Sequence, residues 1–185
     1  MDFDNIKFET KRLSISTIQK QDYDDIYRDI TPSLTRYLSW NPSETFEDFV
    51  QIAEDWQQNM RTQKERLVLT IRDKTDQRFL GLTGIHECLT VLPALGIWIS
   101  ESEHHQGLGR EAVHGLIAWA SQHHIELNIS GFLYPVALEN PPSRKIAEAA
   151  NGTLISYQQE KKFMTLTYYI PLKRDPIDST TSYFI

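Results

Sequence analysis

Two glycines, Gly107 and Gly109, lie between a segment with strand character and a segment with helical spacing. A glycine loop in this position exposes several backbone N–H groups at the positive end of the helix dipole. Because neither glycine has a side chain, a phosphate can approach the main chain closely, and Arg110 adds positive charge nearby. The loop therefore predicts phosphate or pyrophosphate binding, and a plain tight turn is the alternative.

The residues from Gly107 to Ala112 also satisfy the G-x-G-x-x-G/A spacing of dinucleotide-binding proteins. That fingerprint requires an acidic residue at the end of the next strand, about 20 residues further on. Here the next predicted strand ends at Leu133-Tyr134, and the preceding strands have the pattern of an antiparallel meander. A nicotinamide dinucleotide is therefore the disfavoured ligand.

Histidine and cysteine residues do not form a recognisable metal motif. His104-His105 and His123-His124 are adjacent pairs, whose side chains diverge from a strand or helix, and His86 and Cys88 lack a zinc spacing. We predict no metal site. Cys88 is interpreted as a small buried residue, since no Cys-His pairing can be argued from the sequence.

Hydrophobic periodicity predicts the elements that position the glycine loop. Strands are predicted at 12–16, 67–71, 79–85, 94–99, 129–134, 153–157 and 163–170. Helices are predicted at 22–30, 45–61, 109–120 and 140–150. Turn residues at 73–76 and 92–93 make the middle strands an antiparallel meander, whereas the helix at 109–120 provides a crossover to a parallel strand. The pattern indicates a mixed α+β fold.

Composition limits the class of protein. The chain has 185 residues, 40% of them hydrophobic, and one cysteine, which suits one compact domain without disulfides. A net charge of −6 disfavours direct nucleic-acid binding. The longest apolar stretch, 91–99, is too short to span a bilayer, and the first residues lack signal-peptide character. We expect a cytoplasmic protein with a domain over 1–172 and a tail over 173–185 that is able to contact a second subunit in a homodimer.

The glycine loop and four other segments resemble a known family. His104-His105-Gln106-Gly107-Leu108-Gly109 is similar to the acetyl-CoA signature Gln/Arg-x-x-Gly-x-Gly/Ala of the GNAT N-acetyltransferases. Further motifs match its RimJ/RimL branch in order: Thr10-Lys11-Arg12-Leu13, Gly81-x-x-Gly84, Gly96-Ile97-Trp98-Ile99, and Asn140-Pro141-Pro142-Ser143 followed by Gly152. The resemblance covers about residues 8–172. It implies a mostly antiparallel central sheet with one parallel pair of strands and helices on both faces.

The resemblance also implies a reaction and its residues. Acetyl passes directly from acetyl-CoA to a primary amine in a ternary complex, without a metal. The residues implied in coenzyme binding are Ile97, Trp98, Ile99, His104, His105, Gln106, Gly107, Leu108, Gly109, Arg110, Asn140 and Ser143. Ser143 is the implied proton donor to the departing thiolate, and Tyr134 is a second candidate. The alternatives are a helix N-cap for Asn140 and a first-turn hydrogen bond for Ser143.

The sequence departs from the family pattern in two places: the first changes the coenzyme corner, where we still expect binding, and the second leaves the general base open. His104 stands where the signature has Gln or Arg, and Ala94-Leu95 occupy a stretch that is often acidic in the branch. Glu87, at the end of the strand over 79–85, is the candidate base, with a solvated carboxylate as the alternative.

The pKa of the acceptor amine ranks the candidate acceptors. An α-amine has a pKa of about 7.7–8.0 and a lysine amine one of about 10.4, so an α-amine needs less help to lose its proton. With the family resemblance, the favoured acceptor is the N-terminal α-amine of a protein, such as a ribosomal protein. The alternatives are a small amine, such as a polyamine or amino sugar, and a non-catalytic module that binds acyl-CoA. Trp40 is a candidate for the mouth of the acceptor site.

Overall fold

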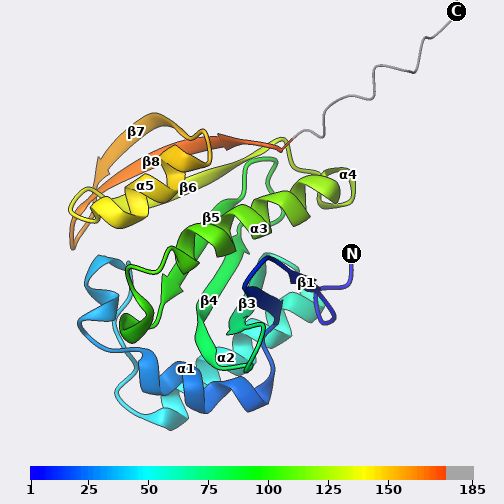
Figure 1. The fold of residues 1–185 in the computed structure, drawn as a ribbon, viewed down its shortest axis with the longest axis vertical. Coiled ribbons are helices and arrows are strands. Elements are labelled where there is room, and N and C mark those ends of the chain that lie inside the picture. The colour runs from blue at the N-terminus through cyan, green and yellow to red at the C-terminus, as the bar shows by residue number, and fades with distance from the viewer. Residues whose placement is uncertain (174–185) are drawn as a thin grey trace, which may run out of the picture.

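The computed structural model describes residues 1–173, which form one twisted sheet with helices on both faces (Figure 1). The strands are β1 (Lys7–Glu9), β2 (Leu13–Thr17), β3 (Arg66–Asp73), β4 (Phe79–His86), β5 (Ala94–Ile99), β6 (Gly131–Ala137), β7 (Thr153–Gln159) and β8 (Met164–Pro171). Their order is β1-β2-β3-β4-β5-β6-β8-β7, and neighbours are antiparallel except β5 and β6. This confirms the predicted fold class.

The helices are α1 (Tyr23–Asp29), α2 (Phe46–Thr62), α3 (Leu108–Gln122), α4 (His124–Leu127) and α5 (Pro141–Ala149). The first two pack on one face of the sheet, and α3 and α5 lie on the other (Figure 1). Within residues 1–173, no helix is long and apolar enough to cross a membrane. The predicted contact of the tail with a second subunit falls on residues outside the described part.

Two short elements and several strand ends differ from the sequence-based expectation. The short strand β1 and helix α4 were not predicted, because three or four residues are too few to show a period. Strand β6 begins at Gly131 and continues to Ala137, past the expected end at Tyr134. Pro135 obscured this extension, although β6 remains hydrogen-bonded to β8 through these residues.

Strands β5 and β6 diverge soon after they meet. Their register contains a single Cα pair, Ala94 with Leu133, and the Leu133 N–H donates to the Pro93 carbonyl at 2.9 Å. Beyond this point the two strands separate, as Figure 1 shows. The sheet therefore has an opening along β5, with backbone groups on an unpaired edge.

An apolar layer between the sheet and α3 fixes the start of that helix at the open end of β5. Ile15, Leu69 and Ile71 have no exposed surface, and Ala112 and Leu116 of α3 are equally buried. Burial of such side chains stabilises the fold by about 1.5–3 kcal/mol each. The packing therefore holds the first turn of α3 and the glycine loop in a fixed position.

A partly buried ion pair fastens the α1 face to the sheet. The Arg72 Nη2 lies 2.6 Å from Asp22 Oδ1, and Asp22 is 2% exposed. We expect Arg72→Met to lower the free energy of unfolding by about 3 kcal/mol, because it leaves the Asp22 carboxylate buried without a cation. Urea unfolding is the measurement. Arg28→Met, which breaks exposed pairs, is the control with an expected loss below about 1 kcal/mol, and equal losses would contradict the assignment.

Candidate active site

The glycine loop presents a row of unpaired backbone donors. Within the described chain, none of the N–H groups of residues 105–110 has a hydrogen-bond partner, and the first intrahelical bond of α3 runs from Glu111 N to Gly107 O at 3.1 Å. No side chain caps this helix. Unpaired N–H groups at a helix N-terminus favour an anion. The loop is therefore suited to the pyrophosphate of acetyl-CoA.

The two positions require glycine for different structural reasons. Gly107 is the N-cap of α3 and has a φ of +74°, in the left-handed region that favours glycine. Its missing side chain leaves open space, because the nearest atom to an added Cβ would be Arg12 Nη2 at 3.8 Å. A Cβ on Gly109 would lie 3.4 Å from side-chain atoms of Ile99 and Ile146. Gly109 therefore permits close packing of α3 against β5 and α5.

Thr10 and Arg12, which lie just before β2, form hydrogen bonds to the first turn of α3 and to the glycine loop. Thr10 Oγ1 and the Arg12 N–H donate to Glu111 Oε1 at 2.6 and 2.7 Å, and Arg12 Nε donates to Oε2 at 2.6 Å. Arg12 Nη1 also donates to the Gln106 carbonyl at 3.0 Å. Burial raises the pKa of Glu111, but these hydrogen bonds and the Arg12 charge outweigh it and lower the pKa below its ordinary value. The Glu111 carboxylate thus ties the loop to β2.

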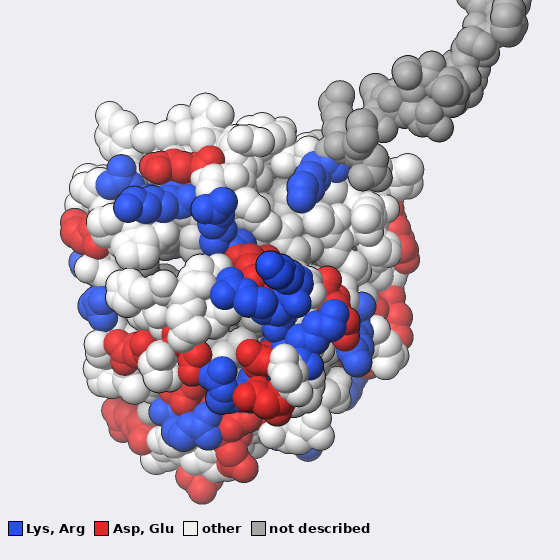
Figure 2. All heavy atoms as spheres, in the orientation of Figure 1, with Lys and Arg blue, Asp and Glu red and all other residues white. Residues whose placement is uncertain are grey.

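Basic side chains surround the outer side of the loop. Arg12, Arg110 and Lys173 line a shallow depression of about 520 Å³ that also contains Gly107. Figure 2 shows Lys and Arg gathered in the middle of the face that carries α3. Local positive charge here opposes the net charge of −6 and favours the phosphates of the coenzyme.

The other predicted loop residues have local partners. His104 Nε2 lies 2.8 Å from the Ile99 carbonyl, and Gln106 Nε2 donates to Glu103 Oε2 at 3.1 Å. His105 is exposed with a φ of +64°, whereas Leu108 is buried. Arg110 points from the exposed first turn of α3. The loop therefore offers main-chain donors, and Arg110 supplies exposed charge.

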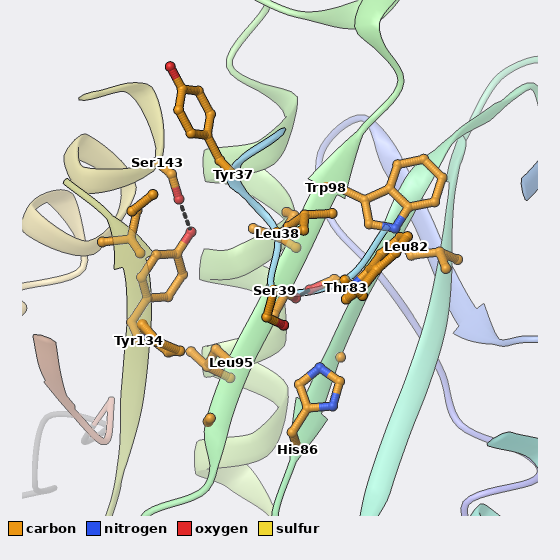
Figure 3. A pocket seen from close by; sticks show the side chains of 18 of the residues that line it. Tyr37, Leu38, Ser39, Leu82, Thr83, His86, Leu95, Trp98, Tyr134 and Ser143 are labelled. Carbon is orange, nitrogen blue, oxygen red and sulfur yellow. Dashed lines mark hydrogen bonds between the residues drawn. The ribbon is translucent and has the colours of Figure 1, made fainter. Parts of the chain in front are cut away.

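A pocket of about 460 Å³ occupies the opening between β5 and β6 (Figure 3). It is lined from both halves of the sheet, including Ile97, Trp98, Tyr134, Asn140 and Ser143, so the structure brings these predicted residues together. Trp40 also lines it, as expected for a residue of the mouth.

The free edge of β5 faces this pocket. The Ser100 N–H donates to the Leu80 carbonyl at 2.9 Å, so the even-numbered residues of β5 direct their backbone groups toward β4. The backbone groups of Ile97 and Ile99 therefore point away from β4 toward the opening, where the Ile99 carbonyl contacts His104 Nε2 at 2.8 Å. Such an edge can pair with an extended amide-bearing chain as an added strand would. Trp98 lines the pocket with its side chain, and its ring packs edge-on against Phe79.

Tyr134 and Ser143 form a hydrogen-bonded hydroxyl pair. Their oxygens are 2.9 Å apart, and Figure 3 shows them pointing toward each other from β6 and α5. The Asn140 side chain accepts from the Ser143 N–H at 3.2 Å, so Asn140 is the N-cap of α5 and fixes Ser143 in its first turn. Burial raises the pKa of Tyr134 to about 12. The pair therefore remains protonated across the physiological range.

His86 is a pocket residue that the sequence analysis did not select as functional. Its ring is open to the pocket, and a methyl group at Gly96 would lie 2.7 Å from His86 Nε2. Desolvation within the pocket and the charge of Arg66 lower the pKa of His86, against a smaller opposing effect of Glu87. A neutral imidazole at pH 7 can accept a proton. The alternation of β4 was the available signal, because it places His86 on the same face as Gly84.

Glu87 does not lie among the residues that line the pocket. It follows the end of β4, is exposed and has a φ of +59°. The neighbouring His86 lines the pocket instead. Cys88 is buried, and burial raises the pKa of its thiol to about 12. Among residues 1–173, no group of three or more His, Cys, Asp or Glu converges as metal ligands would.

Comparisons with known proteins agree with this arrangement. The profile of the acetyltransferase (GNAT) domain matches residues 12–153. No curated protein sequence matches the chain significantly.

Solved structures share the fold at low sequence identity. A RimL ribosomal L7/L12 α-N-protein acetyltransferase in complex with coenzyme A has a TM-score of 0.78 and 13% identity, covering 90% of this chain and 98% of its own. A ribosomal-protein-S5-alanine acetyltransferase from Vibrio fischeri has a TM-score of 0.77 and 14% identity, covering 91% and 97%. A spermidine N-acetyltransferase from Vibrio cholerae, with coenzyme A and spermine, has a TM-score of 0.71 and 17% identity, covering 88% and 97%.

The split parallel pair with its pocket, and the amide-rich loop at the start of α3, agree with the acetyltransferase profile. The chain belongs to the GNAT acetyltransferase family. It is an acetyl-CoA-dependent N-acetyltransferase.

Proposed function

We propose that the protein acetylates the N-terminal α-amine of a protein in the cytoplasm, as a RimJ/RimL-like enzyme with ribosomal proteins among its candidate acceptors. The observation that carries the acetyl transfer is the pocket that brings the β5 edge together with the Tyr134–Ser143 pair. The protein acceptor is supported by two structural neighbours whose names describe ribosomal-protein acetyltransferases.

The coenzyme side of the pocket holds and orients the donor. The N–H groups of residues 105–110 bind the pyrophosphate, and Arg110 adds charge. The edge of β5 at Ile97 and Ile99 pairs with the pantetheine arm, and Asn140 maintains the start of α5 beside it. Bound acetyl-CoA supplies an acetyl thioester at the opening of the sheet.

Two groups of the chain move protons. The Tyr134–Ser143 pair donates a proton to the sulfur that departs from the acetyl group. On the opposite side of β5, His86 Nε2 takes the proton from the acceptor amine, directly or through water. His86 replaces Glu87 as our proposed base, because His86 lines the pocket.

The role of His86 predicts a pH dependence. Because the pKa of His86 lies below about 6.5, its ordinary value, kcat/KM should stay level near neutrality and fall as the pH drops through this lowered pKa. We expect His86→Gln to lower kcat about 100-fold and to remove that acidic limb. The measurement is a pH profile of thiol release.

His124→Gln is the matched control, because His124 lies on α4, outside the pocket lining. The control should retain the profile of the unchanged protein. Retention of the acidic limb in His86→Gln would contradict the assignment.

The proposed function is tested by thiol release from acetyl-CoA with N-terminal peptides, polyamines and amino sugars. We expect peptides to be the best acceptors. Calorimetry with acetyl-CoA and NAD accompanies the assay, and binding is expected for acetyl-CoA alone. Turnover of polyamines or amino sugars in preference to every peptide would overturn the protein acceptor, and tight acetyl-CoA binding without any turnover would indicate a non-catalytic module.

A further inference from the structure

The half of the pocket on the α2 face of the sheet carries a positive charge and no carboxylate. We define this acceptor half by Arg66, His86, Trp98, Trp56, Trp40 and Phe163. Among the described residues that line the whole pocket, Arg66 carries the one permanent charge, and none is Asp or Glu. The chain has a net charge of −6, so this local composition does not follow from the overall balance.

Arg66 has no partner for its charge within residues 1–173. Its guanidinium makes no ion pair and no side-chain hydrogen bond there, whereas Arg72 of the same strand pairs with Asp22 and Asp25. The Nε atom is inaccessible to solvent and unpartnered. A buried donor without an acceptor is costly, and a charged donor more so. The site therefore favours an incoming anion.

The sheet register places Arg66 beside the reacting region. Arg66 pairs with His86 across β3 and β4, and His86 pairs with Ala94 across β4 and β5. The His86 ring extends from this row toward Gly96, two residues further along β5. An acceptor whose amine lies beside His86 can therefore reach Arg66 with a group a few bonds away.

Arg66 also lies away from the coenzyme phosphates. It is at the first residue of β3, beside the closed end of the β5–β6 opening, whereas Gly107 follows the open end of β5. A phosphate on the glycine loop does not satisfy the Arg66 guanidinium.

The mouth of the acceptor half carries a second cation. Lys162, in the turn between β7 and β8, donates from Nζ to the carbonyls of Leu38 and Trp40 at 3.2 and 2.7 Å. These contacts hold the segment 37–40 at the pocket, where Figure 3 shows Tyr37, Leu38 and Ser39. The entrance and the interior thus both favour negative charge, and the walls are aromatic.

We propose that the acceptor is a primary amine that carries a carboxylate, and that Arg66 binds this carboxylate while the amine lies beside His86. The inference rests on the proposed acetyltransferase function and names the acceptor class of the same pocket. A carboxylate can form a bidentate pair with an arginine and satisfy the buried Nε donor of Arg66. A polyamine instead brings several positive charges to a pocket without a carboxylate, where like charges repel.

The test uses matched acceptors at saturating acetyl-CoA and pH 8, with thiol release as the signal. Three amidated peptides differ only in their second residue, which is Glu, Gln or Lys. Phenylalanine and phenylalaninamide test an α-carboxylate as the source of the anion, and spermidine represents the polyamines. The proteins are the unchanged chain, Arg66→Lys, Arg66→Met and Arg66→Glu, with Lys7→Glu on the distant edge strand β1 as the control for charge.

We expect kcat/KM to be at least tenfold higher for a carboxylate-bearing acceptor than for its amide, mainly through KM. Arg66→Lys and Lys7→Glu should retain this preference, Arg66→Met should abolish it, and Arg66→Glu should favour the Lys peptide. Preference for the Glu peptide identifies a side-chain carboxylate, and preference for phenylalanine identifies an α-carboxylate.

Either of two results would overturn the carboxylate inference and leave the proposed function standing. One is acetylation of peptides without any preference for the anion, and the other is a preference that Arg66→Met leaves intact. Spermidine turnover above that of every acidic amine would also overturn it. If the unchanged chain binds acetyl-CoA but acetylates none of these acceptors, the proposed function itself would be wrong. Thermal unfolding of each variant separates a loss of folding from a loss of recognition, and Arg66→Lys provides the conservative rescue.

Discussion

Replacing Gly107 with aspartate is expected to weaken acetyl-CoA binding about 100-fold, because a carboxylate would then stand where we propose that the loop binds pyrophosphate. A side chain at Gly107 enters open space beside Arg12 Nη2, so the substitution is sterically accommodated. The new charge opposes the ligand and also competes for Arg12 and Arg110, which line the same depression. Calorimetry with acetyl-CoA measures the dissociation constant.

Gly107→Asn is the matched control for this substitution. Asparagine has nearly the shape of aspartate, and both tolerate the left-handed conformation at φ +74° better than most residues. We expect a loss below about tenfold for the asparagine variant, since it lacks the charge. Equal losses for the two variants would show that shape alone matters, and unchanged binding by both would place the pyrophosphate elsewhere.

Removal of the hydroxyl pair should give the second large effect. We expect Tyr134→Phe and Ser143→Ala each to lower kcat about 100-fold, because the departing sulfur loses its proton donor. The KM for acetyl-CoA should change little. The double variant should lose little more than the poorer single variant, since the two hydroxyls are hydrogen-bonded at 2.9 Å and act as a unit.

Tyr168→Phe is the matched control for this pair. Tyr168 is directly opposite Tyr134 on β8 and is also buried, but its hydroxyl contacts Glu148 at 3.4 Å. Its kcat should stay within about threefold of the unchanged protein. A kcat in Tyr134→Phe or Ser143→Ala that matches this control would contradict the assignment of that residue as a proton donor.

Local sequence patterns were sufficient for the main elements and for the position of the glycine loop before α3. The meander over β3, β4 and β5 and the glycine loop before α3 each depend on short-range signals of turn chemistry and periodicity. The parallel pairing of β5 with β6 followed from the handedness of a crossover. The motif Asn140–Ser143 similarly contains its own capping geometry.

The acceptor half was harder to foresee, because its residues meet through register between distant segments. Arg66 and His86 become neighbours only when β3 and β4 pair, and a slip of one residue between the two strands would put their side chains on opposite faces. We predicted Glu87 as the general base because it is a carboxylate. Strand β4 ends at His86, and Glu87 lies outside the pocket lining. Lys162 reaches Trp40 across 122 residues of sequence, which no local period reveals.

The central claim is that the main-chain amides of residues 105–110 bind the pyrophosphate of the coenzyme. Titration of the ¹⁵N-labelled protein with coenzyme A, followed by amide chemical shifts, tests it most directly. The largest shifts are expected at residues 105–110, with smaller ones along β5 at Ile97 and Ile99. Saturating shifts at another surface, with these amides unchanged, would contradict the account.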